Sequence, residues 1–328
     1  MKTKQHLLLG AMAMGLACTL GACQNDGETV DLTVPIDLSF TPGVQTRATI
    51  AETGETFEAG DRVGVFLSTA DANQTAAIGQ GAAVNNEPFT RQSGGSWSGT
   101  LYWQNISQWH TFHAYYPYDA ALNGTTVTTK SVTVVQDQHA GSGAGYKAAD
   151  YLWGVSQPTQ ATNNSITVQL QHCMARIVVK LTPGNDMTNA EVDELATTLQ
   201  IMGGTIPATG SMDVTDGIVS ASTAQDAGTL TSITPYRTGS NGSYTYYAIL
   251  LPGSSFKRGD TFVRLVALDK TTYYAYTLDT TSDLTLEGGR QYIFNLKANK
   301  AGIHLDGFTI GTWQTGRTTS GSVDMVVS

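Results

Sequence analysis

The sequence predicts an all-β protein. Hydrophobic residues make up 41% of the 328 residues, charged residues only 14%, and there are 35 glycines, a composition typical of an ordered chain with many short strands and turns. Apolar and polar side chains alternate over residues 166–171, and apolar side chains recur at every second position over 175–181, the period of a half-buried strand. Asn123-Gly124 and Asn241-Gly242 are dipeptides favoured in tight hairpin turns. These features predict an antiparallel sandwich or barrel.

The first expected strand spans residues 32–40. Its apolar side chains occupy every second position, and they are Leu32, Val34, Ile36, Leu38 and Phe40. Pro35 has no backbone N–H for a ladder, so we expect this strand at the edge of a sheet. Residues 41–50 contain Pro and Gly and predict a loop, in which we expect Arg47 to be accessible.

The second half of the chain repeats the strand pattern, as in "YTYYAILLPG" and "GGRQYIFNLKA". One helix is expected over residues 188–200, because Thr188 and Glu191 have the spacing of a capping box. The length suits two domains. Pro and Gly follow a long strand at 182–186, which places the boundary there.

The N-terminus predicts export. Lys2 and Lys4 precede an apolar stretch over residues 7–20 that is too short to cross a membrane. The stretch ends in Leu20-Gly21-Ala22-Cys23, which resembles a bacterial lipobox. That resemblance implies removal of residues 1–22 as a lipoprotein signal peptide, acylation of Cys23 and a polar tether over 23–30. The alternative is an ordinary secretory signal with a coincidental cysteine.

Composition and motifs give no support to catalysis. The net charge is −9 and no long basic run is present, which argues against a nucleic-acid partner. His110 and His113 would lie on opposite faces of a strand, as would the neighbours His172 and Cys173. We therefore predict no catalytic residue, no metal site and no cofactor. A glycosidase carboxylate pair leaves little trace in sequence and stays open, as part of a third hypothesis of a hydrolase with an unrecognised site.

Several segments together resemble the fimbrillin family, the Mfa-like branch of type V pilin subunits. Besides the lipobox they are "QTRATI" at 45–50, "FEAGDRVGVF" at 57–66, "WHTFHAYYP" at 109–117, "DYLWG" at 150–154, "LQHCMARIVVKL" at 170–181 and "LEGGRQYIFNL" at 286–296. The resemblance implies two tandem antiparallel β-sandwich domains of transthyretin-like build, at 31–181 and 182–328. It also implies a precursor that reaches the cell outer membrane as a surface lipoprotein.

The resemblance implies an assembly mechanism as well. An Arg-specific protease would cut between Arg47 and Ala48 and remove the lipidated leader with the first strand. A strand from another fimbrial subunit would then fill the groove. The candidate donor is the C-terminal tail, where apolar residues alternate at Val323, Met325 and Val327. The expected function is that of a structural subunit of an adhesive fimbrium.

The free energy of burying this strand and the stability of a typical domain are consistent with such an exchange. Burying five apolar side chains contributes roughly 7–15 kcal/mol, as an upper estimate. A whole domain is stable by only about 5–15 kcal/mol. A chain that loses this strand should therefore require a replacement.

The alternative function is a monomeric surface lipoprotein that keeps its first strand and binds glycan or protein. Aromatic side chains in "WSGTLYWQNISQW" would suit a sugar platform, although core positions are the favoured explanation for them. They are Trp97, Tyr102, Trp103 and Trp109.

Overall fold

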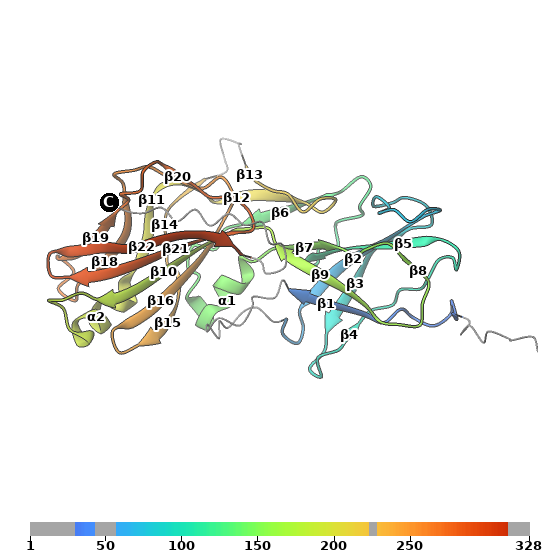
Figure 1. The fold of residues 1–328 in the computed structure, drawn as a ribbon, viewed down its shortest axis with the longest axis horizontal. Coiled ribbons are helices and arrows are strands. Elements are labelled where there is room, and N and C mark those ends of the chain that lie inside the picture. The colour runs from blue at the N-terminus through green and yellow to red at the C-terminus, as the bar shows by residue number, and fades with distance from the viewer. Residues whose placement is uncertain (1–29, 43–56, 223–227, 314–328) are drawn as a thin grey trace, which may run out of the picture.

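Strands dominate both lobes of the molecule, as the sequence predicts (Figure 1). The structure is a computed structural model, and it describes residues 30–42, 57–222 and 228–313. Two helices of the described chain are short: α1 (Ala140–Ala148) and α2 (Asn189–Leu195), the latter followed by a 3-10 turn (Ala196–Thr198). Within these ranges, no helix has the length and apolar character needed to cross a membrane.

One eight-stranded sheet forms what we call the N-terminal lobe. Its strand order is β1-β9-β7-β5-β2-β3-β4, and β8 pairs with β5. All pairs are antiparallel except β1 with β9. The bounds are β1 (Leu38–Pro42), β2 (Arg62–Ala70), β3 (Val84–Arg91), β4 (Trp97–Ser98), β5 (Trp109–Tyr116), β7 (Leu152–Val155), β8 (Thr159–Gln160) and β9 (Ile166–His172).

In the part of the chain that the structure describes, three further sheets form the C-terminal lobe. Their orders are β15-β16-β10-β21-β22, β19-β18-β11-β17-β20 with β14 on β11, and β13-β12-β6. The bounds are β6 (Thr129–Thr133), β10 (Ala175–Pro183), β11 (Gln200–Pro207), β12 (Thr209–Asp213), β13 (Val219–Ala221), β14 (Thr229–Ile233), β15 (Tyr236–Ser240), β16 (Ser243–Leu250), β17 (Ser255–Phe256), β18 (Thr261–Val266), β19 (Tyr273–Thr277), β20 (Leu284–Thr285), β21 (Arg290–Asn299) and β22 (Gly302–Thr312).

The boundary expected after residue 181 does not match the change of sheet. It falls inside β10, which lies between β16 and β21 in the C-terminal lobe. The parallel partner β21 is far away in sequence, so the residues of β10 alone do not predict this pairing. Strand β6, also expected in the first domain, pairs with β12. The division into two domains remains a proposal.

The buried hydrophobic side chains of the described residues form two clusters. The smaller lies within the N-terminal lobe and contains side chains of β1, β2, β3, β5 and β9. The larger fills the C-terminal lobe and reaches Phe66 and Tyr115 on the opposite face of the first sheet. The two lobes are therefore joined by apolar packing.

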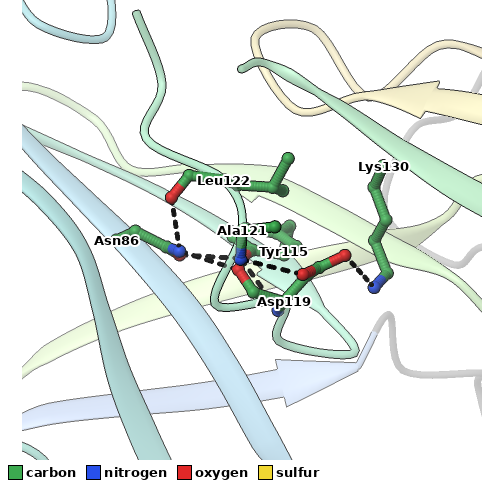
Figure 2. A network of polar contacts seen from close by, with 6 residues as sticks. All are labelled: Asn86, Tyr115, Asp119, Ala121, Leu122 and Lys130. Atoms are coloured by element: carbon green, nitrogen blue, oxygen red, sulfur yellow. Dashed lines mark hydrogen bonds and ion pairs between the residues drawn. The ribbon is translucent and has the colours of Figure 1, made fainter. Parts of the chain in front are cut away.

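A polar network also links the lobes (Figure 2). The Tyr115 hydroxyl donates to Oδ1 of Asn86 at 2.7 Å, and Nδ2 of Asn86 donates to the carbonyls of Asp119 and Leu122, both at 2.8 Å. Lys130, on β6, lies 3.4 Å from the Asp119 carboxylate. The backbone N–H of Ala121 and then Lys130 lower the pKa of Asp119.

Two local predictions are confirmed and one is wrong. Thr188 accepts a hydrogen bond from the Glu191 N–H while the Glu191 side chain accepts from Thr188, so the capping box begins α2. Asn241 and Gly242, both at positive φ, turn the β15–β16 hairpin. Asn123-Gly124 turns no hairpin. Asn123 Oδ1 instead accepts hydrogen bonds from the N–H groups of residues 125–127, which stabilises a loop.

Candidate functional site

Strand β1 lies at the edge of the N-terminal sheet (Figure 1, blue). Among the described strands it pairs with β9 alone, in parallel, with Leu38 opposite Ile166 and Phe40 opposite Val168. The hydroxyls of Ser39 and Thr167 lie 2.8 Å apart across this ladder. One ladder therefore holds the backbone of β1, as an edge position requires.

The strand is shorter than the sequence predicts. It begins at Leu38, and Leu32 and Val34 are 37% and 55% exposed. Asp31 Oδ1 accepts from both N–H and hydroxyl of Thr33, and the Val34 N–H donates to the Asp31 carbonyl at 3.2 Å. An aspartate whose side chain bonds the backbone two residues on favours a turn over a strand. Pro35 thus precedes the strand and does not mark its edge.

Three of the five predicted side chains are buried in the lobe core. Ile36, Leu38 and Phe40 are 6%, 3% and 3% exposed. Burial of three such side chains contributes about 4–9 kcal/mol as an upper estimate. This range overlaps the whole stability of many domains, about 5–15 kcal/mol, so the shorter strand still matters to the fold.

The β1 segment also contacts the opposite end of its own sheet. The Phe40 ring lies 5.6 Å from Phe89 on β3 and 4.9 Å from Trp97 on β4, edge to face in both cases. The Ile36 N–H donates to the Leu101 carbonyl at 2.7 Å. The segment therefore closes the gap between β9 on one side and the β3–β4 end on the other.

Phe57 packs beside this contact. Its ring lies 4.9 Å from Trp97 and 5.4 Å from Tyr116. Tyr116 is fixed in turn, because its hydroxyl donates to Asp61 Oδ1 at 3.0 Å. We call the residues that receive β1 the β1 slot: Phe89, Trp97, Leu101, Val168 and Leu170.

Sequence reasoning identified the apolar alternation of β9 but not the slot. Phe89 and Trp97 come from segments without regular alternation, and only the curl of the sheet brings them to Phe40. The one available signal was the cluster of aromatics between residues 97 and 109.

The residues predicted for processing and donation are not placed by the structure. Cys23, Arg47, Ala48 and the donor residues Val323, Met325 and Val327 lie outside the described ranges. Strand β1 ends at Pro42, and the description resumes at residue 57. The expected cleavage loop thus follows β1 directly in sequence.

The imidazoles of His110 and His113 both hydrogen-bond to backbone groups. His113 Nε2 lies 2.8 Å from the Ala76 carbonyl, and His110 Nε2 accepts from the Gln104 N–H at 3.2 Å. Burial lowers the pKa of both imidazoles. Cys173 is half-buried, and desolvation raises the pKa of its thiol. Over residues 30–42, 57–222 and 228–313, no group of metal-ligating side chains is assembled.

The four aromatic side chains of the alternative function differ in how far they are exposed. Trp103 is 4% exposed, and its Nε1 donates to the Thr162 carbonyl. Trp97 packs against Phe40 and Phe57. Tyr102, at 39% exposure, is the most open of the four side chains.

Comparisons with known proteins give a consistent fold. A model of the fimbrillin-like family matches residues 46–313. A protein from Bacteroides uniformis, provisionally described as a cell adhesion protein, superposes with a TM-score of 0.60 and 19% identity over 88% of this chain and 99% of its own. A protein from Bacteroides ovatus with the same description superposes with a TM-score of 0.59 and 19% identity, over 87% of this chain and 99% of its own. Among curated proteins, none matches the chain.

Proposed function

Because this chain belongs to the fimbrillin-like family, we propose that it is a structural subunit of a cell-surface fimbrium, assembled by removal of its first strand and donation of a strand from another subunit. Adhesion is the expected role of that fimbrium. The sequence match over residues 46–313 supports the fimbrial role. The exchange mechanism is supported by the β1 geometry.

The position of β1 carries the proposal. It occupies a sheet edge, it pairs with β9 alone among the described strands, and it buries Ile36, Leu38 and Phe40. An edge strand can leave without breaking the middle of a sheet. Its departure would expose the β9 backbone and the pocket around Phe89 and Trp97. An added strand would supply backbone hydrogen bonds to β9 and side chains that fill the pocket.

Cleavage after Arg47 would separate β1 from the rest of the chain. Arg47 lies five residues beyond Pro42, the last residue of β1. We propose that an Arg-specific protease cuts there, that Cys23 carries the lipid until then, and that the tail with Val323, Met325 and Val327 is the candidate donor. The outer membrane is the proposed site of the anchored precursor.

Replacing Arg47 tests this mechanism. We expect Arg47→Ala cells to hold unprocessed monomers, and wild-type cells to hold ladders of high mass that resist denaturation. Arg258→Ala, at an exposed arginine of the C-terminal lobe, is the matched control and should polymerise normally. Normal ladders in Arg47→Ala would refute processing at this site. Monomers in the wild type, starting at acyl-Cys23, would favour the monomeric lipoprotein that binds glycan or protein.

A further inference from the structure

A cavity of about 530 Å³ lies at the junction of the two lobes. Its wall includes Trp153 and Gln171 from the N-terminal sheet, with Asp216, Ile218 and Arg290 from the C-terminal lobe. Small-molecule sites usually measure about 300–1,000 Å³ and occur preferentially where domains meet. Its size and position therefore suit a ligand.

Three side chains of this wall have hydrogen-bonding groups without a partner among the described residues. Asp216 Oδ1 accepts from the Ile218 N–H at 2.9 Å, and its Oδ2 has no partner within the described ranges. Gln171 is exposed, and the described residues provide no partner for its amide. Arg290 Nε lies 3.5 Å from an exposed Glu287 carboxylate, an arrangement that leaves its terminal nitrogens available. The wall thus offers acceptors and donors together.

Trp153 adds an aromatic surface of fixed orientation. Its Nε1 donates to the Val214 carbonyl at 2.8 Å. Gly217, at φ +75°, approaches so closely that a Cβ there would lie 2.6 Å from the indole. The absence of a side chain at Gly217 thus lets the loop pack directly on the ring.

The loop that carries Asp216 is internally braced. Asp213 Oδ1 accepts from the Thr215 N–H at 2.9 Å and from its hydroxyl at 2.7 Å, and the Gly217 N–H donates to the Asp213 carbonyl at 2.8 Å. A loop held in this way loses little conformational freedom when it binds a ligand.

We propose that this cavity binds a neutral sugar unit of a glycan. Vicinal hydroxyls both donate and accept, which matches a carboxylate, an amide and a guanidinium side by side. The Gly217 loop covers part of the Trp153 ring, and the part of the indole that lines the cavity offers an apolar surface to the C–H groups of a pyranose. The Asp216 carboxylate opposes an anionic ligand, and Arg290, the cation of the described part of this wall, already has a carboxylate neighbour. Every residue named here follows residue 48 in the sequence, so the site is present both in the uncut precursor and in the processed chain.

Binding of defined saccharides to the soluble precursor tests the site. The probes are lactose, cellobiose and N,N′-diacetylchitobiose, with N-acetylneuraminic acid as the anionic comparison, measured by saturation-transfer NMR and calorimetry. We expect at least one neutral disaccharide to bind saturably. Asp216→Asn keeps the Oδ1 acceptor but replaces Oδ2 with a donor, and Gln171→Ala removes the amide. Each should weaken binding about tenfold, the effect of losing one good hydrogen bond.

Two controls match these variants. Gln169→Ala lies on the same exposed face of β9, outside the cavity, and Asp269→Asn changes an aspartate in a comparably bonded exposed loop. Both should bind like the wild type, and thermal unfolding should show all four variants folded. The proposal is overturned if no neutral probe binds, if N-acetylneuraminic acid binds in preference, or if Asp216→Asn and Gln171→Ala bind like their controls.

Discussion

The Phe40 ring lies 4.9 Å from the Trp97 ring, edge to face, and this contact joins β1 to the strand at the far end of the same sheet. Phe40 is therefore held by β9 through its backbone and by β3 and β4 through its ring. The same side chain that stabilises the precursor marks the space a replacement strand must fill.

Truncation of Phe40 should strongly destabilise the precursor. Phe40→Ala is expected to lower the free energy of unfolding by about 3–5 kcal/mol, because it leaves a cavity between Phe89 and Trp97. Val34→Ala, in the same segment but at an exposed position, should change it by less than about 0.5 kcal/mol. Urea unfolding measures both, and equal effects would show that β1 is not anchored by its ring.

Substitution of Asn86 should destabilise the protein through both its hydrogen bonds and its backbone conformation. Its φ is +49° and its amide satisfies Tyr115 and two carbonyls. Asn86→Ala and Asn86→Gly both leave buried groups unpaired, at about 1–3 kcal/mol. Alanine adds the strain of positive φ, about 1–2 kcal/mol, which glycine avoids. We expect Asn86→Ala to be the less stable variant by calorimetry. Equal stability would contradict this account of the backbone.

Stability should fall in acid partly through Asp119. The Ala121 N–H, and then Lys130, depress the pKa of Asp119 in the folded state. The unfolded chain therefore binds this proton more readily, so the contribution is present above the ordinary aspartate value of about 4 and is lost as pH falls through the folded pKa. In Asp119→Asn, the urea midpoint should fall less than in the wild type as the pH is lowered from about 5 to about 3. An unchanged decline would exclude this carboxylate as a contributor.

Cys173 should react slowly in the folded protein. Desolvation raises the pKa of the thiol, and only the thiolate attacks alkylating reagents. Iodoacetamide at mildly alkaline pH should therefore modify Cys173 far more slowly in native protein than in urea. Mass spectrometry follows the label. Equal rates in the two states would show that the thiol is not protected.

The parts of the fold that depend on local patterns were predictable. The Thr188 and Glu191 spacing correctly predicts the start of α2, and Asn241-Gly242 predicts its hairpin. Alternation correctly identifies β9 and β10 as strands. Pairing was not predictable, because the parallel partner of β10 is β21, more than a hundred residues away. Helix α1 was missed, because a glycine-rich segment gives no helical period.

The candidate site was predictable in its position but not in its contacts. The two-residue alternation of residues 32–40 does not distinguish a strand from a turn stabilised by Asp31, so the predicted strand was too long. The contact of Phe40 with Trp97 depends on the curl of the sheet, a property of the whole lobe. Only an arrangement in space could reveal it.

N-terminal sequencing and mass spectrometry of surface polymers test the central claim most directly. The account predicts that polymerised chains begin at Ala48 and lack residues 32–42. Chains within denaturation-resistant polymers that retain this segment, with Cys23 still acylated, would contradict it.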